Sequence, residues 1–317
     1  VELKLKEKLT NKIFTPLERY NPVEFYREYD IQDSNKLTED LREASLRVAP
    51  TNYINIKGSF GQLLRGDVFN SLRTVGEFAL RNDSISFPEL AYRIELTNSN
   101  YSVTQTASSW IKQFAVAGYK KFLGGNSYDD PNFELRVEYK QEDRNNLIEG
   151  SVGDSLQSGS FSFSEIKPRL LLNNLYDFNL YTGIELRQDN QPLYGVMLDE
   201  SNSFTQVYGL RYAGLNWFST LFELTFRKKI FTEAFISESN ENNNTVLVNW
   251  QTRIDPLNSA FQTDLFYNIT SERLSKIEKI FVETRVGEGN NIYLGELNGN
   301  GLKDMNEFQL TIFNDGK

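Results

Sequence analysis

Hydrophobic and polar residues alternate along the segment Phe178–Arg187, which reads FNLYTGIELR. Phe178, Leu180, Thr182, Ile184 and Leu186 are mostly apolar. The residues that alternate with them are mostly polar and include Glu185 and Arg187. A period of two places successive side chains on opposite faces of an extended chain. The segment is therefore predicted to be a β-strand with one apolar and one wet face.

The same alternation recurs along most of the chain and predicts roughly a dozen strands, at about twenty residues per strand. That spacing is wide for a β-sandwich and typical of a meander with some long loops. The predicted strands are Val1–Leu5, Ile54–Phe60, Leu72–Leu80, Leu90–Leu96, Trp110–Phe122, Phe133–Tyr139, Ser160–Leu172, Phe178–Arg187, Thr205–Tyr212, Phe218–Arg227, Thr245–Ile254, Phe261–Ile269 and Ile277–Val286.

Polar segments between these runs are predicted to be hairpin connections. Short breaks are expected at Asn82–Ser84, at Asn98–Asn100, at QEDRNN after Tyr139, at AGLN after Tyr212 and at DPLNS after Ile254. Longer polar loops are expected at Gly124–Asn132 and Ser237–Thr245. Tight turns at one end and longer loops at the other are a habit of outer-membrane barrels, although soluble sheets also mix loop lengths.

Two segments near the start do not follow the simple pattern. Leu37–Arg47 has helical spacing of its apolar residues, and a strand over Ser45–Ala49 is the alternative. The preceding segment, FTPLERYNPVEFYREYDI, contains Pro16 and Pro22. Because proline cannot donate to a strand ladder, this segment suits a traversing or edge position.

Composition excludes several classes of chemistry. The 317 residues contain no cysteine and no histidine, which excludes disulfides, thiol chemistry, a Ser-His-Asp triad and imidazole-ligated zinc. Sites for hard cations built from oxygen ligands are still open. The net charge of −9, from 34 Lys and Arg against 43 Asp and Glu, argues against nucleic acid or an anionic membrane surface as a partner.

Aromatic residues make up 13% of the chain while the mean hydropathy is −0.49, a combination that suits strands wet on one face. No window approaches the roughly 18 apolar residues of a transmembrane helix. The opening VELKLKEKL has no signal-peptide features, and the chain stops in a loop-like sequence at Asn314–Lys317. We therefore expect this sequence to be an internal portion of a longer protein, or one whose leader has been removed.

One segment carries candidate metal chemistry. In Glu296–Glu307, oxygen-bearing side chains stand at the first, third, fifth, ninth and twelfth places, with glycine at the sixth. This is the ligand spacing of an EF-hand-type calcium loop, and the segment resembles dockerin-like loops, with Glu in place of the usual Asp at the first position. The alternative is a polar turn between strands. The predicted Ca²⁺ ligands are Glu296, Asn298, Asn300, the Leu302 carbonyl, Asp304 and Glu307.

The flanks of this loop carry a second resemblance. VGEGNNIYLGELNGNGLKDMNEFQLTIF and IFTPLERYNPVEFYREYDI, together about a sixth of the chain, resemble segments of very large Bacteroidota outer-membrane β-barrel proteins such as the type 9 secretion translocon. The resemblance implies an envelope protein whose strands form a wide membrane barrel, with an aqueous lumen or bound partner proteins.

Other candidate functional features also have a purely structural interpretation. Trp110, Trp217 and Trp250 could form a sugar-stacking platform or an interfacial aromatic girdle, or simply fill a core or a lipid-facing row. A glycosidase pair could lie among Glu134, Glu138, Glu185 and Glu223, against which stands the interpretation of solvated strand faces.

The sequence thus favours an all-β, antiparallel meander as one β-rich domain over 1–317, part of a large transmembrane β-barrel. Phe178, Leu180 and Ile184 are expected to face lipid, and the wet lumen is expected to hold Glu134, Arg136, Glu185 and Arg187. The expected function is a non-catalytic wall of a conduit for protein or another macromolecule across the bacterial outer membrane. Its expected partners are outer-membrane lipid and proteins of an envelope complex. The alternative is a secreted soluble β-sandwich that binds glycan or a partner protein at the cell surface, with an enzyme third.

Overall fold

The computed structural model describes residues 1–13, 24–31, 37–81, 88–124, 131–148, 155–157, 159–238, 240–256, 261–271, 291–295 and 308–310. The chain divides into two compact units, Val1–Arg273 and Leu274–Lys317, and each is described by itself. In the second unit the described strands β15 (Asn291–Tyr293) and β16 (Phe308–Leu310) form an antiparallel pair.

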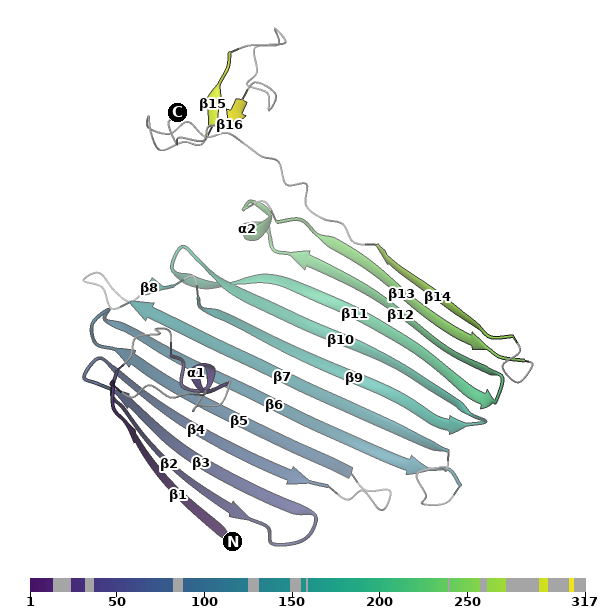
Figure 1. The fold of residues 1–317 in the computed structure, drawn as a ribbon, viewed down its shortest axis with the longest axis horizontal. Helices are drawn as coiled ribbons and strands as arrows, with labels where there is room; N and C mark the ends of the chain where they lie inside the picture. Colours follow the sequence, from purple (N-terminus) through teal and green to yellow (C-terminus); the bar gives the residue numbers. More distant parts are fainter. Residues whose placement is uncertain are drawn as a thin grey trace. The chain divides into compact units, whose positions relative to one another are not determined.

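The first unit is one antiparallel sheet in which strands adjacent in the sequence are also adjacent in space (Figure 1). The sheet follows the path β1-β2-β3-β4-β5-β6-β7-β9-β10-β11-β12-β13-β14, and β8 pairs with β7 beside that path. The strands are β1 (Glu2–Thr10), β2 (Glu39–Val48), β3 (Ile54–Arg65), β4 (Phe69–Leu80), β5 (Pro88–Tyr101), β6 (Thr106–Phe122), β7 (Asn132–Ile148), β8 (Ser155–Leu156), β9 (Phe161–Leu175), β10 (Phe178–Leu193), β11 (Val196–Leu215), β12 (Phe218–Phe231), β13 (Asn243–Ile254) and β14 (Thr263–Ser271).

Turn chemistry explains the tightest connections. The β9–β10 turn consists of Tyr176 and Asp177, and the β10–β11 turn consists of Tyr194 and Gly195, all four with positive φ. Two-residue turns with φ > 0 at both central positions match the right-handed twist of paired strands, which is why they close hairpins of this kind. The all-β antiparallel meander predicted from the alternation is confirmed.

Several predicted boundaries are wrong. Leu37–Arg47 is not helical, because Glu39–Val48 forms β2. The expected breaks at Asn98–Asn100 and after Tyr139 lie inside β5 and β7, and most of AGLN lies inside β11. Asn98–Asn100 and QEDRNN are polar on both faces, and AGLN lacks a strong apolar alternation, but a backbone ladder does not depend on side-chain polarity. The strands therefore continue past the point where their apolar pattern ends.

The sheet is open in the part of the chain that the structure describes. There β1 pairs only with β2 and β14 only with β13, so the described strands do not close into a barrel. The predicted strand Ile277–Val286 and the predicted calcium loop Glu296–Glu307 both lie outside the described residues. Their predictions therefore stay predictions.

Two short helices lie between strands. Helix α1 (Phe25–Glu28) lies between β1 and β2, and α2 (Glu233–Ile236) lies between β12 and β13. A buried apolar cluster forms where α1 and the residues after it pack on one face of the sheet. Its members are Phe25, Tyr29, Leu41, Leu63, Phe69 and Tyr101.

Candidate functional site

The two faces of the sheet differ sharply in chemistry. We call the face that carries Phe178, Leu180 and Ile184 the apolar face, and the face that carries Glu185 and Arg187 the wet face. Residues that are paired across neighbouring strands point to the same side of a sheet. The cross-strand register therefore assigns each of the remaining strand residues to the apolar face or to the wet face. The sorting predicted for β10 recurs on most strands; the exceptions include Phe114 and Phe266, which are exposed on the wet face, and Asp40 and Arg42, which lie on the apolar face of β2.

The apolar face is lined by large hydrophobic side chains that are substantially exposed. On β2 to β14 their exposed fractions run from 37% to 51%. Contiguous apolar surface on this scale marks an interaction with lipid or protein. These side chains are Leu46, Ile56, Phe60, Leu72, Phe78, Leu90, Tyr92, Tyr119, Leu135, Ile166, Leu170, Phe178, Leu180, Ile184, Leu186, Phe204, Tyr208, Phe226, Ile230, Trp250, Leu265, Tyr267 and Ile269.

These residues form a band with a slanted edge. On β5 the band ends at Leu96, since Asn98 follows it on the same face. When paired residues are followed from strand to strand across β6, β7 and β9, Leu96 on β5 is aligned with Asn190 on β10. The band on β10, however, ends at Leu186. The edge has thus moved four residues along the strands over four strand-to-strand steps.

The second half of the sheet shows the same net displacement between β10 and β14, with Ile230 on β12 lying beyond the edge at the level of Gln188. On β14 the band ends at Ile269, before Ser271. The register carries the level of Ile269 across β13, β12 and β11 to Thr182, which again lies four residues before Leu186 after four steps. The displacement is an average, because the edge stays at one level from Tyr139 on β7 through Leu186 to Phe204 on β11. At ~3.3 Å per residue and ~4.8 Å between strands, an average of one residue per strand corresponds to a slant of roughly 35°.

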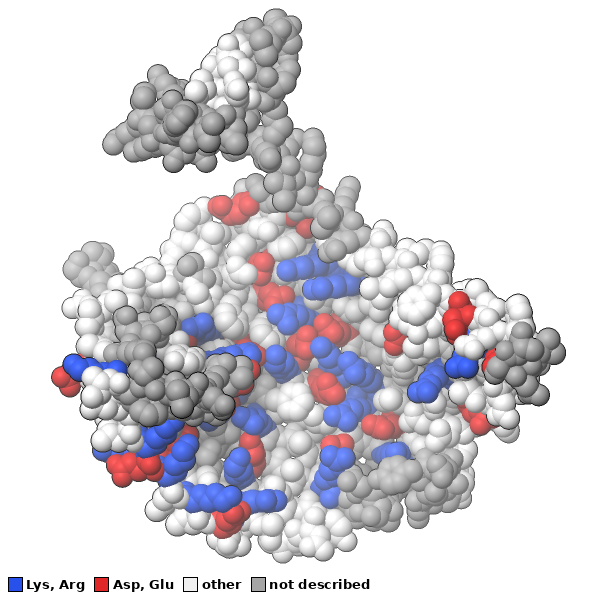
Figure 2. All heavy atoms as spheres, viewed as in Figure 1, with Lys and Arg blue, Asp and Glu red and all other residues white. Residues whose placement is uncertain are grey.

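The wet face carries a dense set of paired charges (Figure 2). Glu95 is 5% exposed and is contacted by three cations: Arg73 Nε at 3.2 Å, Arg93 at 3.0 Å and Lys112 Nζ at 3.3 Å. Each partner projects from β4, β5 or β6 toward the same carboxylate. The three cations offset the desolvation cost of burying the Glu95 carboxylate.

A second network continues across the next strands of the wet face. Lys167 on β9 bridges Glu165 at 2.7 Å and Glu185 at 3.1 Å, and Arg187 on β10 contacts both Glu165 at 3.6 Å and Asp189 at 2.6 Å. The charges are therefore spread along the sheet in alternating sign. They are not gathered into a single cleft.

The segment Glu24–Ile31 lies on the wet face and is held by contacts to several strands. Glu28 pairs with Arg73 at 3.3 Å, and the Glu28 carbonyl accepts a hydrogen bond from the Thr97 hydroxyl at 3.2 Å. Asp30 accepts a hydrogen bond from Ser99 at 3.2 Å and forms an ion pair with Arg144 on β7. The segment is thus tied to β4, β5 and β7, and we call it the docked segment.

Tyr29 anchors the docked segment. Its side chain is 1% exposed, and its hydroxyl donates to Glu43 Oε1 at 2.8 Å. Burial, and next the hydrogen bond to Glu43, raise the pKa of Tyr29 well above its usual range. The phenol lies against Gly61, where any Cβ would collide with its hydroxyl oxygen. Glycine at this position therefore creates the space that the anchor occupies.

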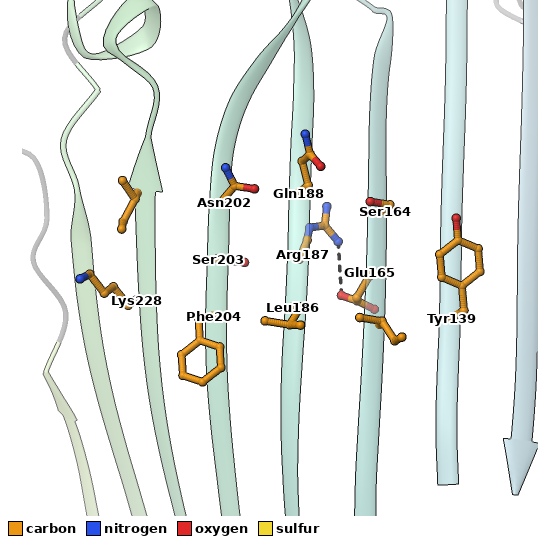
Figure 3. Close-up of a pocket in the computed structure, with 12 residues that line it drawn as sticks. Tyr139, Ser164, Glu165, Leu186, Arg187, Gln188, Asn202, Ser203, Phe204 and Lys228 are labelled. Carbon is orange, nitrogen blue, oxygen red and sulfur yellow. Dashed lines mark ion pairs between the residues drawn. The ribbon is translucent and has the colours of Figure 1, made fainter.

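A groove of about 360 Å³ crosses the edge of the apolar band on β9 to β12 (Figure 3). Ile166, Leu186 and Phe204 line its apolar side, and Gln188 and Asn202 line its polar side. Lys228 on β12 also lines it, at the level of Phe204 in the register. Glu165 and Arg187, which project from the wet face, also belong to its lining and contact each other at 3.6 Å. On the apolar face the groove therefore joins apolar surface, amide groups and the cation of Lys228.

The candidate catalytic and sugar-binding residues do not converge. Glu138, Glu185 and Glu223 are each engaged with a separate partner: Arg136 at 2.9 Å, Lys167 at 3.1 Å and the Tyr181 hydroxyl at 2.6 Å. The fourth carboxylate, Glu134, shares their wet face. Of the tryptophans, Trp110 is buried on the wet face under Lys112 and Arg144, Trp250 is exposed on the apolar face, and Trp217 lies in the β11–β12 turn. They do not form one platform.

The described residues hold no group of three or more acidic side chains placed to bind a metal ion, and the predicted calcium ligands lie outside them. Among the described helices, none is both long and apolar enough to cross a membrane. Sequence reasoning missed the docked segment and the groove. Phe25 and Tyr29, four residues apart, were the available signal for a short helix with one apolar side.

No protein-family model matches the chain, and no curated protein or solved structure matches it. The functional argument therefore rests on the two faces of the sheet.

Proposed function

We propose that this chain is a non-catalytic section of the wall of a transmembrane β-barrel in the bacterial outer membrane. In this proposal the apolar face contacts lipid, and the wet face lines a conduit for protein or another macromolecule. The observation that carries the proposal is the slanted apolar band. A bilayer is a flat slab, so its boundary must cross tilted strands obliquely and displace the apolar edge by a constant amount per strand.

The dimensions of the band support lipid as the covering material. Its slant of roughly 35° falls at the lower limit of the 35–45° strand tilt of transmembrane barrels. On β10 the band runs from Phe178 to Leu186, which is ~26 Å along the strand and ~22 Å along the normal of a bilayer at that tilt. Outer-membrane barrels have an apolar belt ~25 Å tall.

The wet face supports an aqueous lining. Its charges are paired locally and recur from β2 to β12, as a solvated wall requires, whereas an active site gathers its acids and bases at a few positions. The docked segment lies on this side, where a loop can narrow a lumen. The absence of histidine and cysteine is consistent with a structural role.

The free edges support a wall that continues beyond these strands. The path holds thirteen strands that alternate in direction, so β1 and β14 run the same way. A closed barrel that is antiparallel throughout needs an even number of strands. Completion would then require an odd number of additional strands, from elsewhere in the same protein or from a partner protein of the envelope.

Reconstitution tests the proposal. The full protein should need detergent for extraction from membranes, and in planar bilayers it should conduct once bound partners are stripped away. A stable monomer that is soluble without detergent would overturn the proposal in favour of a secreted sandwich protein. Turnover of a glycan that is lost on a single Glu→Gln change would overturn it in favour of an enzyme.

A further inference from the structure

The groove at the edge of the apolar band contains an isolated cation. Among the apolar-face positions of 178–190, 202–212, 218–230 and 244–254, Lys228 is the single charged side chain. It forms no ion pair or hydrogen bond with any described residue. Its neighbour Lys229 points to the wet face and faces Glu200 at 3.9 Å. The chain thus neutralises the cation on one face and leaves the adjacent one available.

The surroundings of Lys228 combine two kinds of surface. Asn202 lies diagonally across the ladder from Lys228, and its side-chain amide makes no hydrogen bond with a described residue. On the other side of the groove edge, Leu186 and Phe204 lie on neighbouring strands (Figure 3). Together with Ile166, the register partner of Leu186, they continue into the apolar band. An ammonium and an amide suit a phosphate oxygen, and the adjoining apolar surface suits hydrocarbon.

We propose that this groove binds the phosphate headgroup of an anionic lipid through Lys228 and Asn202, with an acyl chain along Phe204 and Leu186. The inference rests on the proposed membrane function, which places the edge of the band at headgroup level. A lysine at that level extends its ammonium to the interface, where an anionic headgroup is its natural counter-ion.

The net charge of −9 does not oppose this site. Glu185 and Glu223 project from the wet face, so they lie across the sheet from the headgroup. On the apolar face, Asp199 accepts a hydrogen bond from Gln188 at 3.2 Å and makes no ion pair with Lys228. At ionic strength near 0.15 M, charges are screened over about 8 Å of solvent. Of the other charged residues that line the groove, Glu165 is paired with Arg187 at 3.6 Å and with Lys167 at 2.7 Å, so the charge of Lys228 is the one that no described carboxylate neutralises.

The experiment compares lipid retention by the detergent-solubilised full protein in native mass spectrometry. Phosphatidylglycerol should be retained in preference to phosphatidylcholine. Lys228→Gln should reduce that preference about fivefold, the factor that corresponds to about 1 kcal/mol per lysine near an anionic headgroup. Lys228→Arg should keep most of it. The matched control is Lys229→Gln, which removes the same charge one residue away on the wet face and should leave the preference unchanged.

Other results would overturn the proposed lipid site. An unchanged preference in Lys228→Gln, or an equal loss in Lys229→Gln, would show that the groove does not select the headgroup. Competition by millimolar inorganic phosphate alone would identify a free-anion site and overturn the lipid proposal. In each of these cases lipid is still retained, so the proposed membrane function stands. Retention of neither lipid would overturn this site, while the membrane function is tested separately by detergent extraction and conductance.

Discussion

A depth series of arginine substitutions along β10 distinguishes lipid from protein as the cover of the apolar face. Thr182, Ile184 and Leu186 point to the same side of β10. Thr182 lies at the middle of the band, Ile184 lies two residues from its edge, and Leu186 lies at the edge. An arginine costs about 2–4 kcal/mol at the bilayer midplane and about 0–1 kcal/mol near the interface. The free energy of unfolding should therefore fall most for Thr182→Arg, by ~2 kcal/mol or more, by a smaller amount for Ile184→Arg at intermediate depth, and least for Leu186→Arg.

The exposed fractions make the test sharp. Ile184 is 42% exposed and Leu186 is 47% exposed, so a solvated or loosely covered sheet would tolerate arginine at both within about 0.5 kcal/mol. The measurement is equilibrium denaturant unfolding of the protein in phospholipid vesicles. A cost that does not depend on depth, or one that is largest at Leu186, would refute the reasoning.

The wet-face control needs a position with room for a side chain. Gly183 is unsuitable, because a Cβ there would lie 3.1 Å from Arg169 Cγ and 3.4 Å from the Pro168 carbonyl oxygen. Thr225 on β12 points to the wet face, at the same register level as Gly183. Thr225→Arg should therefore cost much less than Ile184→Arg. Equal sensitivity on the two faces would indicate a sheet buried on both sides.

Three further predictions concern the docked segment and the calcium loop. Gly61→Ala should displace Tyr29 and expose the docked segment to limited proteolysis, at an overpacking cost of about 1–3 kcal/mol, whereas Gly58→Ala, with open space around its Cβ, should be near neutral. Because the pKa of Tyr29 is higher in the folded state, Tyr29 should contribute its full stabilisation below the unfolded pKa of about 10 and lose it as the pH rises above that value. Denaturant titrations of the Tyr29→Phe variant should lack this loss of stability at alkaline pH. Calorimetry should detect calcium binding that Glu307→Gln weakens, and the absence of any calcium heat would rule out the predicted loop.

The sequence predicted the strands where one face is apolar and failed where both faces are polar. Period-two alternation located most strands of the sheet, including the core of β10, because the apolar band imposes it. Beyond the band, as at Asn98–Asn100 in β5, no side-chain signal marks the strand, yet backbone pairing continues. Boundaries drawn from hydropathy therefore track the band edge and not the end of the ladder.

The site features that were missed depend on register. That Lys228 stands beside Phe204, or that Tyr29 fills the space over Gly61, follows from which residues of distant strands are paired. The residues that pair between distant strands could not be predicted from this single sequence. The slant of the band likewise appears only when strands are aligned by their ladder hydrogen bonds. The division into an apolar and a wet face, in contrast, required only the alternation within each strand.

Nitroxide scanning tests the central claim most directly, and the absence of cysteine makes single-cysteine labelling clean. Labels at Leu180 and Ile184 should be accessible to oxygen dissolved in lipid, while a label at Thr225 should be accessible to a water-soluble nickel complex. Labels at Leu96 and Ile269 should report equal bilayer depth, because both mark the edge of the band despite lying at different levels of the ladder. Low oxygen accessibility on both faces, or depths that follow the ladder and not the slanted edge, would contradict a membrane wall.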